Sequence, residues 1–240
     1  MKPGTVTIHI IPPCPSGPVA TRMDDSPLTE EEHARSAKFR SAADSIRWAH
    51  YRSALRNILS ARLEIPPRKV PITISPYGKP QLAAPFEHLH FNLSHSETLA
   101  LVASSTDGPV GIDLEPLTRA RDLLNYQRSF CHPQEITRLR SVPRTHLAEL
   151  LLEIWSYKES LLKAVGTGLY HPPEALRIQP GPAARKTMTA TSDTPLPGID
   201  QQRLHRLHHA DLTEYMATLS APPSIRRIEI IRFETSTSRR

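Results

Sequence analysis

The longest regular pattern of apolar positions in the chain lies between Leu147 and Val165. Apolar side chains recur there at spacings of three and four residues, which is the period of one face of an α-helix. Gly166 and Gly168 follow directly, and glycine adopts the left-handed conformation that ends a helix without steric cost. The pattern therefore predicts a helix over residues 146–165.

Charged residues interrupt the apolar face of this helix. Lys158 lies four residues after Ile154 and three before Leu161, so it falls on the apolar stripe, where an unpaired cation is costly to desolvate. Glu159 and Lys163 are spaced i and i+4 on the adjacent face. A snorkelling lysine beside a helix-stabilising ion pair explains this pattern as well as a binding site does. The stretch alone leaves both interpretations open.

Strict alternation of apolar and other residues over 110–115 predicts a β-strand. Its second face carries Asp113 and Glu115, with Cα atoms about 7 Å apart. Two like charges at this spacing repel unless water or a cation separates them. Mg²⁺ prefers such oxygen ligands, usually alongside substrate phosphates. With Glu159 and the two lysines of the helix, the pair indicates a metal–diphosphate site.

Shorter patterns predict the remaining elements. Strands are expected at Thr5–Ile11, Val70–Ser75, His90–Ser94, Leu99–Ser104, Ala175–Gln179, Gln202–Leu207, Thr213–Ser220 and Arg226–Phe233. Helices are expected to begin near Pro27 and to cover Asp44–Arg62, Asp122–Phe130 and Pro133–Arg140.

Two connections have their own signals. An Asp-Gly pair in residues 105–108 predicts a hairpin between Leu99–Ser104 and the strand of Asp113. That hairpin would place Ser94 and His95 on the strand beside Asp113. Residues 180–197 are polar and rich in proline, so they are predicted to be a loop.

Five short motifs in order resemble those of the 4′-phosphopantetheinyl transferases. Gly111-Ile-Asp-Leu-Glu115 and Trp155-Ser-Tyr-Lys-Glu-Ser-Leu-Leu-Lys163 resemble the two signature motifs of this family, and Gly166-Thr-Gly168 follows the second. The match is closest to the larger, monomeric kind that activates surfactin synthetase. Three more motifs fit: Tyr77-Gly-Lys-Pro80, Phe91-Asn-Leu-Ser-His-Ser96, and Phe130 with Glu135 five residues later. Each motif is weak alone, but the ordered set, over roughly residues 35 to 170, is specific.

The resemblance implies an α+β fold built as a pseudo-twofold pair of similar halves. Each half would have a small antiparallel sheet and a long helix, with the ligand cleft between the halves. We expect the first half to span residues 1–116 and to hold the nucleotide end of coenzyme A. The second half, residues 117–234, would carry the metal-site helix, and residues 235–240 would form a disordered basic tail.

The resemblance also implies a reaction. Members of the family transfer the 4′-phosphopantetheine moiety of coenzyme A to a serine of an apo acyl or peptidyl carrier protein, and adenosine 3′,5′-bisphosphate is released. In this chain Mg²⁺ would be held by Asp113, Glu115 and Glu159, and the catalytic residues would be Glu159 and Lys163. We expect Glu159 to accept the proton of the partner's serine, directly or through water.

Coenzyme A contacts follow from the same resemblance. The expected cofactor-binding residues are Arg47, Lys79, Ser94, His95, Asp113, Lys158 and Lys163, with Arg35, Lys38 and Glu135 as further candidates. A solvated basic face is the alternative interpretation of the arginines and lysines before residue 48. The chain departs from the family at two positions there: Glu32 stands where surfactin-type members tend to carry lysine, and Trp48 stands where a smaller residue is usual.

Composition narrows the partners and the compartment. A net charge of +6 favours anionic partners: nucleic acid, an acidic protein or a phosphorylated small molecule. The resemblance implies that the partner is an acidic carrier protein. No apolar run approaches the roughly 20 residues of a membrane span. Cys14 and Cys131 are too few for a disulfide framework, so we expect free thiols and a cytoplasmic protein. The resemblance implies a monomer. The cluster His205, His208 and His209 lacks acidic or cysteine partners at ligand spacing, which argues against zinc.

Two other functions fit parts of the sequence. Basic charge with an acidic cluster also suits another Mg²⁺-dependent phosphotransferase or an enzyme of nucleic acids, but neither interleaved aromatic residues nor a basic recognition helix is evident. An inactive carrier-protein-binding module is the second alternative. A decayed site should have lost at least one of its acids or lysines, and this one has lost none.

Overall fold

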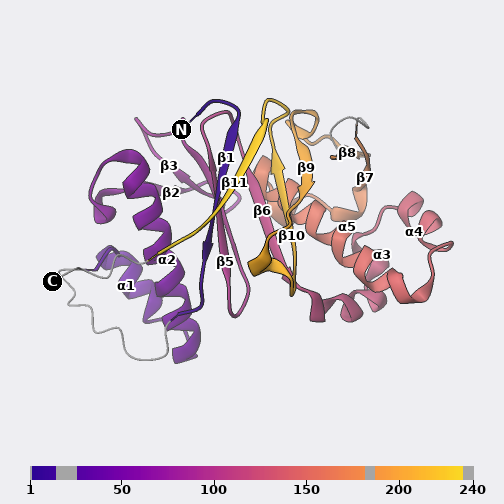
Figure 1. Cartoon of the computed structure of the whole chain (residues 1–240), viewed down its shortest axis with the longest axis horizontal. Coiled ribbons are helices and arrows are strands. Elements are labelled where there is room, and N and C mark those ends of the chain that lie inside the picture. The colour runs from indigo at the N-terminus through magenta and orange to yellow at the C-terminus, as the bar shows by residue number, and fades with distance from the viewer. Residues whose placement is uncertain (1, 15–25, 182–186, 235–240) are drawn as a thin grey trace.

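Two β-sheets form the centre of the molecule, and helices cover their outer faces (Figure 1). The computed structural model describes residues 2–14, 26–181 and 187–234. The helices are α1 (Glu30–Ser36), α2 (Ala42–Leu63), α3 (Gln127–Phe130), α4 (Pro133–Leu139) and α5 (Arg144–Val165), with a long 3₁₀ segment at Leu117–Asn125. The strands are β1 (Thr5–Ile11), β2 (Ile72–Ile74), β3 (Pro80–Leu82), β4 (His90–His95), β5 (Ala100–Ser105), β6 (Gly111–Pro116), β7 (Leu176–Pro180), β8 (Met188–Ser192), β9 (Arg203–Arg206), β10 (Tyr215–Ala221) and β11 (Arg227–Arg232).

The two large sheets repeat one strand order. The first sheet has the order β11-β1-β5-β4, and the second has the order β6-β10-β9-β8-β7. In each, an opening strand (β1 or β6) pairs antiparallel with the last strand of its half (β5 or β10), and the strand before that one comes next. This repeat confirms the predicted pair of α+β halves. The last strand, β11, then returns to the first sheet and pairs in parallel with β1.

One long helix covers each sheet. Helix α2 begins at its N-cap Ser41, whose hydroxyl accepts from the amide of Asp44, and it packs Leu55 and Leu59 against the first sheet. Helix α5 packs Leu161 and Leu162 against the second sheet. Gly166, with φ of 86°, ends α5 as the sequence predicted. None of the described helices is long and apolar enough to cross a membrane.

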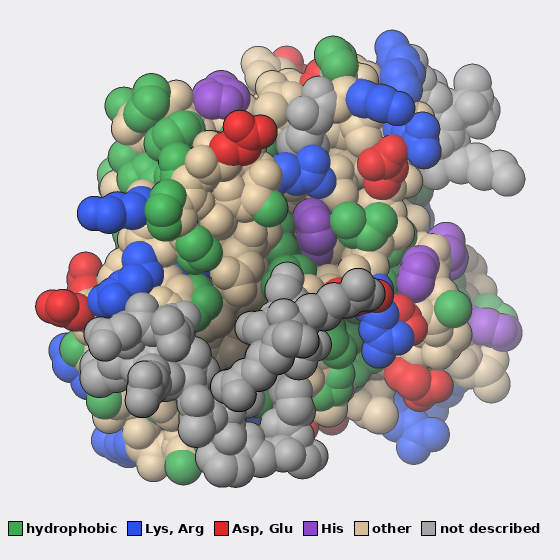
Figure 2. Space-filling view, turned by 60° about the vertical axis from the view of Figure 1, so that its left-hand side comes forward, with side chains coloured by type: hydrophobic (Ala, Val, Ile, Leu, Met, Phe, Trp, Pro, Cys, Tyr) green, Lys and Arg blue, Asp and Glu red, His purple; other side chains and the backbone are tan. Residues whose placement is uncertain are grey.

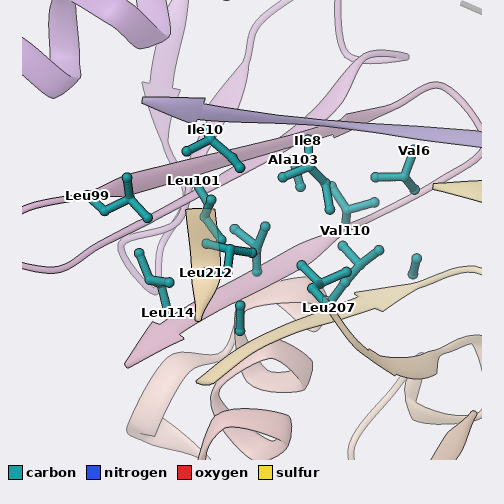
Figure 3. Close-up of a cluster of buried hydrophobic side chains, with 14 of the residues drawn as sticks. Val6, Ile8, Ile10, Leu99, Leu101, Ala103, Val110, Leu114, Leu207 and Leu212 are labelled. Carbon is teal, nitrogen blue, oxygen red and sulfur yellow. The ribbon is translucent and has the colours of Figure 1, made fainter. Parts of the chain in front are cut away.

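A shared apolar core fills the space between the sheets (Figure 3). The first sheet contributes Ile8, Ile10 and Leu101, and the second contributes Ile112 and Leu219, all of them at most 1% exposed. Because both faces of β5 meet apolar layers, every residue of this strand is buried, as its uninterrupted apolar sequence predicted.

The predicted hairpin between Leu99–Ser104 and the strand of Asp113 is wrong. Strand β5 is hydrogen-bonded along one edge to β1 and along the other to β4, so it has no free edge for β6. Strand β6 pairs instead with β10, a partner about a hundred residues further along the chain. Sequence-local turn chemistry cannot foresee a partner at that distance.

Other local predictions also need correction. The predicted loop over residues 180–197 contains β8, whose Met188 and Ala190 pack partly buried against the core beside α5. Strand β3 was not predicted. The expected helix over residues 122–130 is a 3₁₀ segment followed by the short α3. The half boundary after residue 116 remains a prediction, and the expected tail lies outside the described residues.

Candidate active site

Strand β6 and helix α5 approach each other more closely than side chains would allow. At Gly111 a Cβ atom would lie 2.0 Å from the carbonyl oxygen of Ser160 and 2.3 Å from the amide nitrogen of Ala164. Any other residue would force the helix away from the strand. The glycine therefore lets Asp113, further along β6, lie within reach of Lys163 on α5.

Lys163 is the centre of a polar cluster between β4, β6 and α5. Its ammonium donates to Asp113 Oδ1 at 2.6 Å and to Ser94 Oγ at 3.3 Å. The same nitrogen lies 3.8 Å from Glu159 Oε2, one helical turn back. Ser94 Oγ is also 3.4 Å from Asp113 Oδ1. Two strands from different sheets and one helix thus converge on a single ammonium group.

One carboxylate oxygen of this cluster has no partner. Asp113 is 2% exposed, and its Oδ2 makes no hydrogen bond although it is buried. A buried acceptor without a donor costs about 1–3 kcal/mol of free energy. The unused oxygen is therefore available to a cation or to a donor that arrives with a substrate.

The charges of the cluster perturb one another. Burial raises the pKa of Glu159, and the carboxylates of Asp113 and Glu115 raise it further, while Lys163 opposes the shift. Burial disfavours the charged form of Lys163, but the carboxylates of Asp113 and Glu159 outweigh burial and raise the pKa of its ammonium. The site thus combines a firmly charged lysine with an acid that ionises reluctantly, as general acid–base and metal sites often do.

Glu115 is held in place by Trp155 and Arg119, which are not ligands of Lys163. The indole Nε1 of Trp155 donates to Glu115 Oε1 at 3.0 Å, and Arg119 forms an ion pair with the same oxygen. The Arg119 guanidinium also lies over the Trp155 ring, 5.8 Å from its centroid. Because both contacts use Oε1, the second oxygen of Glu115 is not committed to either partner.

Asn92 joins the first sheet to the strand that carries Asp113. Strand β6 is an edge strand whose outer edge faces β4. The side-chain oxygen of Asn92 on β4 accepts from the Ile112 amide at 2.9 Å, which satisfies an edge N–H that no strand reaches. This bond positions β6, and with it Asp113, relative to Ser94.

The donor set suits a hard cation. Three carboxylates, one with an unpartnered buried oxygen, match the oxygen ligands of Mg²⁺. Among the described residues, no three His, Cys, Asp or Glu side chains converge into a ready-made cage. Lys163 forms ion pairs with Asp113 and Glu159, and Arg119 forms one with Glu115. The residues therefore fit Mg²⁺ by chemistry, in competition with two cationic side chains.

Comparison with known proteins agrees with this geometry. Residues 109–219 match the family model of the 4′-phosphopantetheinyl transferase superfamily, and residues 21–107 match the model of the 4′-phosphopantetheinyl transferase N-terminal region. The chain is 35% identical to the 4′-phosphopantetheinyl transferase HetI of Nostoc sp. over 65% of its own length and 70% of the relative's. The chain belongs to the 4′-phosphopantetheinyl transferase family.

Other relatives and a solved structure match this chain at lower identity. A putative 4′-phosphopantetheinyl transferase of Synechocystis sp. is 33% identical over 59% of this chain, and the match spans 58% of that relative. The 4′-phosphopantetheinyl transferase Sfp of Bacillus subtilis is 26% identical over 65% of this chain and 73% of its own. A solved holo-(acyl-carrier-protein) synthase from Bacillus anthracis aligns with 47% of this chain and 92% of its own, with a TM-score of 0.37 and 19% identity.

The structure of this phosphopantetheinyl transferase family member brings most of the predicted core site together. Asp113, Glu159, Lys163 and Ser94 lie in one cluster. Glu115 lies near it, since its charge raises the pKa of both Glu159 and Lys163. Ser94 lies next to Asp113 as predicted, although the two residues belong to different sheets. The roles of these residues remain predictions.

Lys158 does not join the cluster. It is 0% exposed, and its ammonium donates to Glu135 Oε2 at 2.6 Å. Its other acceptors are the carbonyl oxygens of Phe130 at 2.7 Å, Leu176 at 2.7 Å and Pro173 at 3.1 Å. The predicted contact of Lys158 and Glu135 with coenzyme A is therefore not supported, because each is the other's buried partner.

The residues expected at the nucleotide end are less tightly grouped. His95 stacks on Tyr51, with ring centroids 5.7 Å apart, and the charge of Arg47 reaches both of these side chains. Arg47 itself forms an ion pair with Asp44. Arg35 lies over the Trp48 ring, and Lys38 is exposed.

Lys79 lies in the connection between β2 and β3. Its ammonium donates to the carbonyl oxygen of Ala164 at 2.8 Å and to that of Val110 at 3.3 Å, so it links the β2–β3 hairpin to the end of α5. It lines a pocket of about 400 Å³ between that hairpin and Gly166. Burial lowers the pKa of Lys79 to about 8.

Three contributors were missed by reasoning from the sequence. Asn92, Trp155 and Arg119 hold β6 and Glu115 in position. Asn92 and Trp155 lie inside the recognised motifs, so the motifs signalled their importance but not their partners. Arg119 lies outside them, and only its spacing of four residues from Glu115 hinted at a contact.

Proposed function

We propose that this chain transfers the 4′-phosphopantetheine moiety of coenzyme A to a serine of an apo acyl or peptidyl carrier protein. The other product is adenosine 3′,5′-bisphosphate. The observation that carries the proposal is the Lys163 ammonium, held 2.6 Å from Asp113 and 3.8 Å from Glu159 in a partly open site. Family membership and both signature motifs support the same assignment.

The reaction divides the diphosphate of coenzyme A, so charge must be neutralised as the bond breaks. Lys163 is positioned to meet the diphosphate, since its side chain is 27% exposed and its charged form is favoured by the acids around it. A preorganised cation stabilises charge that develops on a leaving phosphate. Lys163 therefore acts mainly in the transition state.

Mg²⁺ completes this proposal, with Asp113, Glu115 and Glu159 as the residues that would hold it. When bound, the metal would supply Lewis-acid stabilisation of the phosphate oxygens. Asp113 offers its unpartnered oxygen, and Glu115 offers the oxygen that Trp155 and Arg119 do not use.

The nucleophile comes from the partner protein. Glu159 is the proposed proton acceptor for the partner's serine, because its raised pKa brings its basicity closer to neutral pH than that of an ordinary glutamate. The carboxylate also lies beside the charged Lys163, so a proton accepted there stays within the cluster.

The nucleotide of coenzyme A is proposed to lie along Ser94, His95 and Arg47. These residues extend from the cluster towards α2 and offer hydroxyl, imidazole and guanidinium donors, which suit a 3′-phosphate. Lys79 is proposed to contact coenzyme A at the pocket that it lines together with Gly166. Arg35 and Lys38 remain outer candidates.

The proposed partner is an acidic carrier protein of fatty acid, polyketide or nonribosomal peptide synthesis, met in the cytoplasm by a monomeric enzyme. The net charge of +6 favours such a partner. On the face shown in Figure 2, basic and acidic side chains are interspersed rather than gathered in one basic stripe. That distribution suits a protein surface better than a nucleic-acid backbone.

Mass spectrometry of an apo acyl carrier protein incubated with this protein, coenzyme A and Mg²⁺ tests the proposal. We expect the carrier to gain one phosphopantetheine group, and EDTA or replacement of the carrier's modified serine by alanine should prevent the gain. If none of a panel of acyl and peptidyl carrier proteins gained this mass, the result would contradict the proposal. A salt-dependent shift of DNA mobility by submicromolar protein would favour a nucleic-acid function instead.

A further inference from the structure

A second pocket lies at the far end of the core between the sheets, near the turn from β10 to β11 at the top of Figure 1. Its volume is about 320 Å³. Strand β9 forms one wall: Leu204 and Arg206 face α5, so the alternating residues Arg203 and His205 face the opposite way, into this pocket. Apolar side chains of the β10–β11 connection form another wall: Pro222, Ile225 and Ile228.

Two buried polar atoms of residues that line this pocket have no partner. Thr187 is 6% exposed, and its hydroxyl makes no hydrogen bond to any described residue. His205 Nε2 is also buried without a partner. Buried polar atoms are nearly always satisfied in folded proteins, so two of them at one cavity indicate a ligand with polar atoms.

The charge of the pocket is of one sign. Arg203 and Arg226 line it, and none of the described residues that line it carries a carboxylate. Neither of these arginines forms an ion pair within the part of the chain that the structure describes. Two arginines close to them in sequence do form ion pairs. Arg206 pairs with Glu149 and Glu153 of α5, and Arg227 pairs with Glu229. Arg203 Nη1 donates to the carbonyl oxygens of Asp200 and Gln202, and Arg226 Nη1 donates to that of Pro223, so both groups meet neutral acceptors. Two guanidinium charges without a carboxylate partner among the described residues, beside two unsatisfied polar atoms, favour an anion.

We propose that this pocket binds a phosphorylated small molecule. Its phosphate would accept hydrogen bonds from Arg203, Arg226 and the hydroxyl of Thr187, and from His205 in the tautomer that carries hydrogen on Nε2. The organic part would contact the apolar wall. A volume of about 320 Å³ leaves room for more than the phosphate itself.

This pocket is not part of the proposed active site. Thr218 of β10 pairs with Asp113, and the pocket begins at Pro222, which is about 13 Å further along the chain at the rise of a β-strand. A ligand bound there leaves the cluster around Lys163 free. The proposal therefore stands or falls independently of the transferase activity.

The NMR signal of the His205 side chain would report directly on binding in the pocket. We would label the full-length protein with ¹³C-histidine, assign the His205 signal with a His205→Gln variant, and titrate inorganic phosphate at pH 7.5 and constant ionic strength. Burial lowers the pKa of His205, so the ring is neutral at this pH and its signal does not move by titration. We expect a saturable shift of the His205 signal in the wild-type protein.

Matched arginine variants locate the binding. Arg203→Gln and Arg226→Gln should each weaken phosphate binding about tenfold or more, since each removes a charge-assisted hydrogen bond. Arg206→Gln and Arg227→Gln remove the same charge from nearby arginines that do not line the pocket, and they should change the phosphate affinity less than twofold. Equal weakening by all four variants would show a general charge effect and overturn the proposal.

Thr187→Val separates binding from folding. It keeps the size of the side chain and removes the unsatisfied hydroxyl, so phosphate affinity should fall while the melting temperature is maintained or rises. A His205 signal that does not saturate up to about 20 mM phosphate would exclude the site. A titration with acetate completes the experiment. A shift of the His205 signal by acetate as large as that by phosphate would exclude a preference for phosphate.

Discussion

Lys158 and Lys163 lie on the same helix, five positions apart, and their surroundings are opposite. Lys158 is completely buried, and four oxygen atoms surround its ammonium. Lys163 is partly exposed and shares its charge with Asp113 and Glu159, while Asp113 Oδ2 has no partner. The first site is complete within the protein, and the second is incomplete.

The difference separates a fully buried ion pair from a partly exposed one. Glu135, the partner of Lys158, also accepts from the amides of His132 and Ile178, so one carboxylate ties α4 and β7 to α5. A ligand could not enter this group without breaking bonds that hold the fold. Around Lys163, by contrast, a cation or a hydrogen-bond donor that arrives with a substrate would reach the unpartnered Oδ2 of Asp113 and reduce the repulsion between the carboxylates.

The largest expected effect is on stability, from Lys158→Met. It leaves the Glu135 carboxylate buried without its cation, and breaking a buried pair typically costs about 3–5 kcal/mol of unfolding free energy. Urea denaturation would measure the loss. The double variant Lys158→Met with Glu135→Gln should recover part of it, because the glutamine oxygen can still accept a backbone amide. A Lys158→Met protein of wild-type stability would contradict the architectural role.

Lys163→Met should act on turnover instead. Loss of a preorganised electrostatic contact typically lowers the rate about 10²–10³-fold, and kcat and kcat/KM should fall together because the contact strengthens in the transition state. The methionine keeps the apolar stem, so the melting temperature should stay near that of the wild type. Lys163→Arg should restore only part of the rate. A raised KM for coenzyme A with unchanged kcat would make Lys163 a binding residue.

Asn92→Ala tests whether the position of Asp113 depends on the contact between the sheets. The Ile112 amide loses its acceptor, which should cost about 1–3 kcal/mol of stability, and kcat should fall because β6 is no longer held. The control is Gln202→Ala, which removes another buried amide side chain, one that contacts Pro109 and Ser220 at the other end of β6 and β10. Equal kcat in the two variants would remove Asn92 from the site.

Dephospho-coenzyme A should bind about tenfold more weakly than coenzyme A, as loss of one charge-assisted hydrogen bond implies. The donors for the 3′-phosphate would be Arg47, Ser94 and His95. Steady-state kinetics with both substrates would measure the ratio of KM values. Arg47→Gln should reduce this ratio, and equal KM values in the wild-type protein would place the 3′-phosphate elsewhere.

The smallest expected effect is on the pH profile. Burial and the neighbouring carboxylates raise the pKa of Glu159, and its ionised form is the proposed proton acceptor. Activity should therefore fall, as the pH is lowered, at a higher pH than an ordinary glutamate would give. The pH dependence of kcat/KM would show this acid limb, and Asp113→Asn should move it towards lower pH by removing a repelling charge. A limb at the ordinary glutamate pKa would contradict the role of Glu159.

Much of the fold and the site followed from local sequence. The period of the apolar residues placed α5 within two residues of its observed bounds, and alternation placed β6 and its two acids on one strand. Side-chain periodicity is a property of a single element, so the sequence alone determines it. The resemblance of the five ordered motifs to one family supplied the identity of the fold.

Only the tertiary structure decided which lysine lies in the partly open cluster with Asp113 and Glu159. The local pattern places Lys158 on the apolar stripe and Lys163 on the adjacent face, but it does not show which of them meets the acid of β6. Their difference depends on Glu135 and Leu176 on one side of α5 and on Asp113 and Ser94 on the other. The pairing of β6 with β10 was likewise hidden, because a strand's hydrogen-bonding edge accepts any partner and long-range packing selects it. The sequence determines which residues can carry a charge. The tertiary structure determines which partners each charged side chain contacts.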